Sequence, residues 1–284
     1  MIRQILLSLR THPDRASQQV LEGAAFLAQL LGASLTAHIP QLCSDPQTWP
    51  AIVGTFPLDF PQMMDEAVTQ SETNAAELAD EVSKVCAELK VPLDTRRSLA
   101  TLLASADELI DLGRLHDLTI LPVPHTDVLG SSGMEAVIFG TARPTLLLPS
   151  GKGKKPLQSL DRVVVAWDYS REAARAMADA MPILSRAREV RVISVFGEKG
   201  IHTTCVAGDL EKYLAAHKVN YVLERVELSY GTIGDCVMSH ASAVINADLL
   251  VLGAYGHSRL REFILGGATR AILADARLPV LLSH

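Results

Sequence analysis

The sequence repeats one series of short apolar runs, so that each half of its 284 residues carries a version of the same pattern. The first half opens with the run Ile2–Leu9, and the second half opens with Leu160–Trp167. Later in each half, an apolar run with an Asp-Leu pair near its start appears at 116–122 and again at 247–253. The runs are continuous instead of alternating with polar residues, which is typical of parallel strands that are covered on both faces of a sheet.

Each half is predicted to fold as strands that alternate with helices. The strands expected in the first half are Arg3–Leu9, Ser34–Ile39, Leu93–Leu99, Leu118–Val123 and Thr145–Leu148, and its helices are Ala16–Leu31, Pro61–Leu89, Ser105–Arg114 and a short one at Met134–Thr141. The strands expected in the second half are Arg162–Trp167, Glu189–Phe196, Tyr221–Leu228, Ala247–Gly253 and Pro279–Ser283, and its helices are Arg171–Ser185, Asp209–His217, Ile233–Asn246 and Gly267–Ala276. Right-handed crossovers between such strands produce doubly wound sheets. We therefore predict an α/β fold with two tandem doubly wound five-stranded, mostly parallel sheets and helices on both faces.

The two halves are joined by Ser150–Pro156, whose glycines, lysines and proline are typical of an exposed linker. We therefore predict two domains, at 1–150 and 157–284. The lysines of the linker are expected to be solvated, with an acidic partner as the alternative. The connection Pro40–Pro61 is rich in proline and is expected to be an irregular loop.

Composition and charge argue against several classes of protein. The formal net charge of −6 is unlike that of a general nucleic-acid binder, which normally presents a basic face. No apolar run reaches the roughly 18 residues that cross a bilayer, and the short, charged start of the chain lacks the features of a secretory signal. The four cysteines are isolated, without a C-x-x-C pair, so a disulfide framework is not expected. We therefore expect a cytoplasmic protein that contacts neither nucleic acid nor a membrane.

Glycines gather where the Asp-Leu run of the second half ends. The run ends at Gly253, Gly256 follows in the loop, and the pair Gly266–Gly267 opens a helical pattern. Glycine lets backbone N–H groups approach a bound group closely, and a helix N-terminus adds unpaired donors and the positive end of its dipole. This order of strand, glycine-rich loop and helix start predicts a phosphate cradle at the carboxyl end of a parallel strand. The alternative is a set of tight turns without a ligand.

A strand followed by Asp168-x-Ser170, together with Gly253-x2-Gly256-x9-Gly266 near the end of the chain, resembles the universal stress protein family. The resemblance covers essentially the whole chain as two family domains in tandem. It implies an adenine-nucleotide α-hydrolase-like fold and a regulatory role in the stress response. The expected ligand is ATP or AMP, with or without Mg²⁺, and no enzymatic turnover beyond slow ATP hydrolysis is expected. It also implies that the last strands of the two domains, Thr145–Leu148 and Pro279–Ser283, pair with each other, and it leaves a homodimer of two chains open.

The resemblance assigns the nucleotide to the second domain. Asp168 is expected beside the ribose and adenine, Val195 at the adenine edge, and Gly253 and Gly256 beneath the phosphates. The helix start at 266–269 is expected to receive phosphate oxygens. The candidate binding residues are Ala166, Trp167, Asp168, Val195, Leu252, Gly253, Gly256, His257, Gly266, Gly267, Ala268 and Thr269.

Both domains depart from the family pattern. In the second domain, Gly267 stands where the family has Ser or Thr, and Tyr169 stands where glycine is common directly after Asp168. In the first domain, two prolines occupy the loop where glycine and amide donors are needed, and the first strand runs into Arg10 without the aspartate. We therefore predict that the first domain is a degenerate partner with a structural or regulatory role.

Several residues keep alternative interpretations. Asp168 could cap the following helix instead of touching a ligand, and Ser170 is better explained as a cap than as a nucleophile. Asp168 and Asp235 could hold Mg²⁺ beside ATP, and Cys236 and His240 have a spacing compatible with a metal site that lacks visible further ligands. No Walker A, H-E-x-x-H or G-x-S-x-G motif occurs. The main rival function is a scaffold of the stress response that binds no nucleotide, and an adenylyl-transferring enzyme is ranked last.

Overall fold

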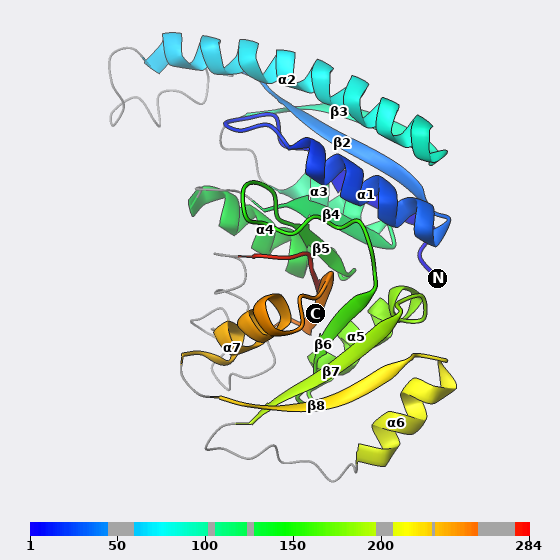
Figure 1. Cartoon of the computed structure of the whole chain (residues 1–284). Helices are drawn as coiled ribbons and strands as arrows, with labels where there is room; N and C mark the ends of the chain where they lie inside the picture. The colour runs from blue at the N-terminus through cyan, green and yellow to red at the C-terminus, as the bar shows by residue number, and fades with distance from the viewer. Residues whose placement is uncertain (45–59, 102–105, 124–127, 197–206, 229–230, 255–275) are drawn as a thin grey trace.

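The structure, a computed structural model of the whole chain, describes residues 1–44, 60–101, 106–123, 128–196, 207–228, 231–254 and 276–284 (Figure 1). The first half contains β1 (Gln4–Ser8), α1 (Gln18–Leu31), β2 (Ser34–Leu42), α2 (Phe60–Leu89), β3 (Leu93–Ala100), α3 (Asp107–Arg114), β4 (Leu118–Pro122), α4 (Val128–Gly140) and β5 (Thr145–Leu148). The second half contains β6 (Arg162–Ala166), α5 (Arg171–Leu184), β7 (Glu189–Phe196), α6 (Ala207–Ala216), β8 (Tyr221–Glu227), α7 (Ile233–Ser239), a π-helix (His240–Val244), β9 (Leu249–Gly253) and β10 (Val280–Ser283). Strands and helices therefore alternate along the chain, as the pattern of apolar runs predicts.

The strands of the described residues form one ten-stranded sheet in the order β3-β2-β1-β4-β5-β10-β9-β6-β7-β8. Neighbouring strands are parallel within each half, and both halves have the strand order third, second, first, fourth, fifth. The halves meet at β5 and β10, which run antiparallel with Leu146 opposite Leu281. The two five-stranded sheets expected from the sequence are thus joined edge to edge.

Helices cover both faces of this sheet (Figure 1). One face buries apolar side chains of α1, α2, α5 and α6 against the sheet. The other face buries those of α4, α7 and the π-helix, with α3 packed beside them. Because the central strands are covered on both sides, β4, β5, β9 and β10 are buried along almost their whole length. The predicted doubly wound α/β architecture is confirmed.

An aspartate directly before the fourth strand anchors the first strand in each half. Asp117 accepts hydrogen bonds from the backbone N–H groups of Arg3 at 2.8 Å and Gln4 at 3.1 Å. Asp248 accepts one from the N–H of Arg162 at 3.0 Å. Burial opposes ionisation of both carboxyls, but the hydrogen bonds outweigh it, so the pKa of each is lowered. The same contact in both halves shows that the repeat extends from the order of strands to individual hydrogen bonds.

Three predicted element boundaries are wrong. Strand β2 continues through Pro40 to Leu42, where the sequence suggested the start of a loop. Helix α4 starts at Val128 and is longer than the short helix expected from Met134. The single helix expected over Ile233–Asn246 is instead an α-helix followed by a π-helix. The helix expected at 267–276 lies outside the described residues.

The linker between the halves is less exposed than its composition suggests. Residues 151–153 are exposed, but Ser150 is buried. The Nζ of Lys155 lies 2.8 Å from the carboxylate of the buried Asp248 and 2.7 Å from the carbonyl oxygen of Asn246. The expectation that Lys155 is solvated is therefore wrong, because this lysine ties the linker to the amino ends of β6 and β9. None of the helices in the described ranges is both long and apolar enough to cross a membrane.

Candidate functional site

The predicted nucleotide site lies at the carboxyl ends of β6, β7 and β9. In the second half the strand order reverses between β6 and β9, which pair in parallel with Val165 opposite Val251. Doubly wound sheets bind ligands at such a reversal, because the connecting segments diverge there to opposite faces. Asp168 follows β6 and Gly253 ends β9, so the structure brings these two predicted site residues to the same edge.

The turn between β6 and α5 is held by its own side chains. Asp168 Oδ1 accepts a hydrogen bond from the backbone N–H of Ser170 at 2.9 Å. Ser170 is the N-cap of α5, and its Oγ accepts from the N–H of Ala173 at 3.1 Å. The interpretation of Ser170 as a cap is confirmed, and Asp168 stabilises the turn that precedes the cap.

Tyr169 adopts a backbone conformation that normally favours glycine. Its φ of 61° lies in the left-handed region, which costs a residue with a Cβ roughly 1–2 kcal/mol. This is the position where the family commonly has glycine. The ring of Tyr169 packs edge-to-face on Trp167 with the centroids 5.5 Å apart, and this contact offsets part of the cost. The substitution therefore keeps the shape of the turn and adds an aromatic ring at its tip.

Trp167 places an unused donor at the same edge. Its backbone is fixed by two hydrogen bonds, from its N–H to the carbonyl of Ile193 at 2.8 Å and from Ser194 Oγ to its own carbonyl at 2.7 Å. The indole Nε1 is buried and has no hydrogen-bond partner within the described structure. Buried indole N–H groups normally find an acceptor, so this one indicates a partner other than the described residues.

Gly253 has a structural reason to be glycine. A Cβ placed on Gly253 would lie 2.4 Å from the backbone carbon of Glu172 and 2.7 Å from the backbone nitrogen of Ala173. The end of β9 therefore approaches the first turn of α5 backbone to backbone. Glycine is required here by packing alone, whether or not a phosphate is bound.

The remaining predicted residues are placed unevenly. Ala166 ends β6, Val195 is half-buried near the end of β7, and the side chain of Leu252 belongs to the apolar core. The predicted phosphate-loop and helix-start residues Gly256, His257, Gly266, Gly267, Ala268 and Thr269 lie outside the described residues. The described residues therefore include the ones for which the sequence analysis predicts contacts with ribose and adenine.

The predicted metal pairs are engaged in other contacts. Asp235 accepts hydrogen bonds from Thr232 N at 3.1 Å and from Thr232 Oγ1 at 2.7 Å, which completes a capping box at the start of α7. His240 Nε2 lies 2.8 Å from a carboxylate oxygen of Glu224. The described ranges contain no group of three or more His, Cys, Asp or Glu residues that could hold a metal ion.

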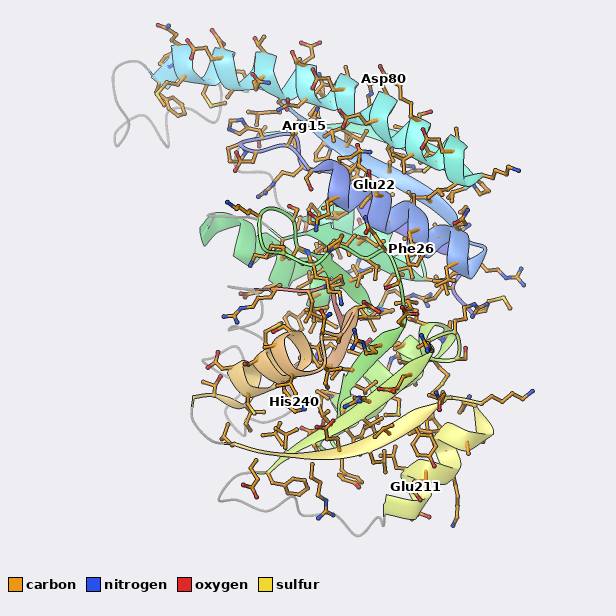
Figure 2. All side chains as sticks on the ribbon, in the orientation of Figure 1. Arg15, Glu22, Phe26, Asp80, Glu211 and His240 are labelled. Atoms are coloured by element: carbon orange, nitrogen blue, oxygen red, sulfur yellow. The ribbon has the colours of Figure 1, made fainter. Side chains whose placement is uncertain are left out.

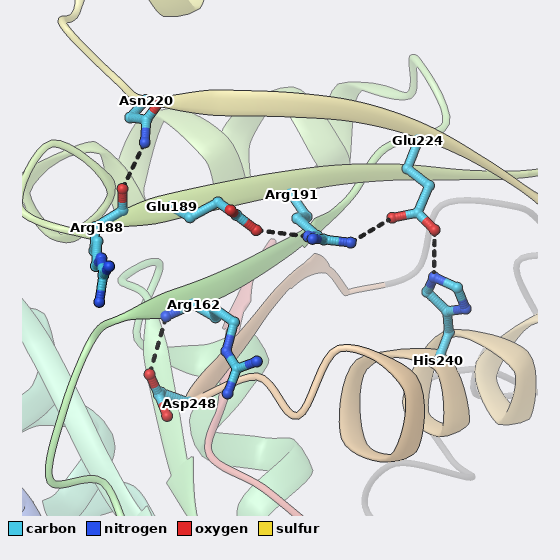
Figure 3. A network of polar contacts seen from close by, with 8 residues as sticks. All are labelled: Arg162, Arg188, Glu189, Arg191, Asn220, Glu224, His240 and Asp248. Atoms are coloured by element: carbon cyan, nitrogen blue, oxygen red, sulfur yellow. Dashed lines mark hydrogen bonds and ion pairs between the residues drawn. The ribbon is translucent and has the colours of Figure 1, made fainter.

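His240 instead ends a chain of polar contacts that sequence analysis does not predict (Figure 3). Glu189 contacts Arg191 at 2.6 Å, Arg191 contacts Glu224 at 3.5 Å, and Glu224 contacts His240. The chain runs along β7 and β8 to the π-helix. Arg191, Glu224 and His240 are far apart in the sequence, and the pairing of the two strands and the turn of the π-helix bring them together.

Comparisons with known proteins identify relatives of this fold and sequence. Residues 207–284 match the model of the universal stress protein family. Universal stress protein Slr1230 from Synechocystis sp. is 30% identical over 154 residues, which cover 53% of this chain and 50% of the relative. The chain thus spans about half the length of this curated relative.

Solved structures extend the likeness over nearly the whole chain. A universal stress protein from Archaeoglobus fulgidus has 18% identity and a TM-score of 0.70, with 98% of this chain and 95% of that chain covered. The cytoplasmic domain of a prokaryotic cation chloride cotransporter has 11% identity and a TM-score of 0.51, with 99% and 95% covered. At these identities the structures show a shared fold alone. The family match over residues 207–284 and the curated relative thus show that this chain is similar to universal stress proteins, and the solved structures show that it shares their fold.

Proposed function

We propose that this chain is a cytoplasmic regulatory protein of the stress response that binds an adenine nucleotide, ATP or AMP, in its second half. The observation that carries the proposal is the β6–α5 turn at the reversal of strand order. There Asp168 is held in place by Ser170, beside the buried and unpartnered indole N–H of Trp167. A fixed acceptor and an unused donor at this edge suit the hydroxyls and ring nitrogens of a nucleoside.

Asp168 has the capacity to bind a ribose in this arrangement. A carboxylate offers about four acceptor positions, and the N–H of Ser170 donates to Asp168 Oδ1 at 2.9 Å. The bond to Ser170 also fixes the direction of the side chain, so little side-chain entropy remains to be lost on binding. The phosphates would then meet the glycine-rich loop and helix start that the sequence predicts after β9.

The departures from the family pattern favour weak binding. At Gly267 a backbone N–H is available, but the hydroxyl of the usual Ser or Thr is missing. A lost hydrogen bond to a charged group is worth about 1.5–3 kcal/mol, which corresponds to a loss in affinity of tenfold or more. The site therefore suits a sensor that responds to millimolar nucleotide better than one that retains it permanently, and no turnover beyond slow hydrolysis is proposed.

A scaffold without nucleotide is the second candidate, and the pairing of β5 with β10 favours it. In this proposal the predicted domains at 1–150 and 157–284 act as a pair inside one chain, and the first serves as the structural partner. The open edges of the ten-stranded sheet are then β3 and β8, which would be the strands available to a second chain.

Calorimetry with the full chain tests the nucleotide proposal. We expect ATP or AMP to bind with one site per chain, measured with and without Mg²⁺. Asp168→Asn keeps an acceptor for the N–H of Ser170 but removes the charge, and it should weaken binding tenfold or more. Asp161→Asn changes an exposed aspartate at the amino end of β6 and should leave binding unchanged. Absence of heat with a folded protein at millimolar ATP and AMP would reject the nucleotide site and leave the scaffold.

A further inference from the structure

Buried side-chain nitrogens without a partner are concentrated at the carboxyl edges of the two halves. In the described part of the chain there are four: Arg10 Nε, His12 Nδ1, His38 Nδ1 and Trp167 Nε1. Trp167 belongs to the second-half site described above. The other three lie at the corresponding edge of the first half, on β2 and in the segment that follows β1. Buried polar groups without a partner are rare in folded proteins, so these three nitrogens call for an explanation.

Arg10 occupies the position of Asp168. Ser8 of β1 pairs with His38 of β2, as Ala166 of β6 pairs with Ile193 of β7. Two residues beyond each strand end, the second half has an aspartate and the first half has an arginine. A residue on the neighbouring strand changes as well, from the apolar Ile193 to His38. The first half therefore presents cationic and donor groups where the second half presents a carboxylate.

Arg10 and His38 lie on the same face of the sheet. Leu7 and Leu9 of one strand, and Ala37 and Ile39 of the other, pack into the core under α1 and α2. Side chains alternate along a strand, so His38 and Arg10 point to the opposite face. The N–H of Leu9 donates to the carbonyl of His38 at 2.8 Å, which fixes the two strands side by side at this point.

The segment that carries Arg10 and His12 is held rigidly by α2. Thr11 Oγ1 donates to the carbonyl of Pro40 at 2.6 Å and lies 2.7 Å from Ser71 Oγ. The side chain of Asn74 donates to the carbonyl of Thr11 at 2.8 Å. Arg15 follows in the same segment and lies beside α2 (Figure 2). Its guanidinium forms ion pairs with Glu77 and Glu81 of that helix. Preorganisation of this kind reduces the entropy lost when a ligand binds.

The Nδ1 atom of His38 is buried and has no partner within the described structure. Its side chain is only 5% exposed, and its Nε2 lies 3.0 Å from Ser98 Oγ and 3.7 Å from the carboxylate of Glu108. When the Ser98 hydroxyl donates to Nε2, the ring proton of the neutral imidazole stands on Nδ1. Burial lowers the pKa of His38, which favours this neutral form. Of two smaller effects, Glu108 raises this pKa and Arg96 lowers it. Glu108 approaches the other ring nitrogen and is itself largely exposed.

We propose that Arg10 and His38, together with His12 from the same segment as Arg10, form a binding site for a phosphate group at the carboxyl edge of β1 and β2. Arg10 supplies the permanent charge, and the two imidazoles supply further N–H donors, a combination that matches a tetrahedral oxyanion. The ligand is inorganic phosphate or a small phosphate monoester. The first half is then a second binding unit with inverted charge, independent of the proposed nucleotide site.

Nitrogen-detected NMR of the histidines in the full chain tests this site directly. Titration with inorganic phosphate, against sodium chloride at equal ionic strength, should shift the Nδ1 signals of His38 and His12 and leave His240 unaffected. Glycerol phosphate separates the two sources, since tighter binding than inorganic phosphate indicates a monoester. Unchanged His38 and His12 signals at millimolar concentrations of both phosphates, or shifts equal to those in chloride, overturn the proposal.

Variants give a second readout by thermal denaturation in phosphate. Arg10→Met keeps the aliphatic part of the side chain and should reduce phosphate affinity tenfold or more, as expected for a lost hydrogen bond to a charged group. Arg97→Met removes an exposed arginine of β3 and should bind phosphate like the native chain. Asp168→Asn should also retain the phosphate effect, which keeps this test separate from that of the nucleotide. Equal phosphate binding by the Arg10 and Arg97 variants would refute the assignment, and the NMR titration of the native chain decides if Arg10→Met does not fold.

Discussion

Replacement of Gly253 by alanine should destabilise the protein because of a backbone clash. The added Cβ would lie 2.4 Å from the Glu172 backbone carbon. Carbon atoms normally approach to about 3.5 Å, so the deficit is about 1.1 Å (3.5 minus 2.4). Both clashing atoms belong to the backbone in the capped first turn of α5 and cannot rotate away. Overpacking typically costs 1–3 kcal/mol, and we expect the upper end, about 3 kcal/mol.

Urea denaturation at pH 7, followed by circular dichroism, measures this loss in the free energy of unfolding. Gly208→Ala is the matched control, because nothing lies within 4 Å of its added Cβ. In the α6 helix, alanine should stabilise by roughly 0.5–1 kcal/mol. If Gly253→Ala unfolds at the same urea concentration as the native chain, the close approach of β9 to α5 does not constrain this residue. In that case the glycine would be explained better by a ligand.

Three further predictions concern buried charge, a titrating histidine and backbone strain. Asp248→Ala leaves Lys155 and the Arg162 N–H without this acceptor, and the free energy of unfolding at pH 7 should fall by about 3 kcal/mol. The difference from the native chain should vanish as the pH falls through the lowered pKa of the Asp248 carboxyl, and a difference that persists in acid would contradict the assignment. His38 has a lowered pKa in the folded protein, so below pH 6.5 the unfolded chain takes up more protons and the free energy of unfolding should decrease as the pH decreases. His38→Gln should make this pH dependence weaker in urea titrations, and an unchanged pH dependence would exclude His38 as its source. Tyr169→Gly relieves about 1–2 kcal/mol of strain and loses a ring contact worth about 0.5–1.5 kcal/mol, so the free energy of unfolding should change by no more than about 1.5 kcal/mol while calorimetry shows tighter ATP binding. Weaker ATP binding would show that the ring helps to hold the ligand.

The buried strands are the part of the fold that sequence reasoning predicts best. Thr145–Leu148 and Glu189–Phe196 have the predicted bounds. The first is a short, fully buried run between two prolines, which leaves little freedom in its placement. Pro40 shows where the reasoning fails. Proline normally ends a strand, but β1 stops at Ser8, so at this point β2 has only β3 as a neighbouring strand and the missing N–H breaks no ladder bond to β1.

Contacts between distant residues account for what the sequence could not reveal about the site. The glycine at 253 was interpreted as part of a phosphate loop, and its contact with the first turn of α5 depends on how β9 and α5 pack. Lys155 was interpreted as solvated because its partner, Asp248, lies in another part of the sequence. Arg10 was interpreted as the loss of an aspartate. Alignment of the two halves strand by strand is the signal that identifies it as an inversion of charge.

The pairing of β5 with β10 inside one chain removes a constraint that applies to assemblies of identical subunits. When two copies of one chain pair about a two-fold axis, every substitution appears at both equivalent positions. Here the equivalent positions belong to different segments of one polypeptide, and each can change alone. Arg10 and Asp168 can therefore stand at matching places with opposite charge, while Asp117 and Asp248 keep the same contact in both halves. The two halves are arranged like the subunits of a symmetric dimer, but their equivalent positions can carry different residues, as in a heterodimer, and the two halves stay covalently joined.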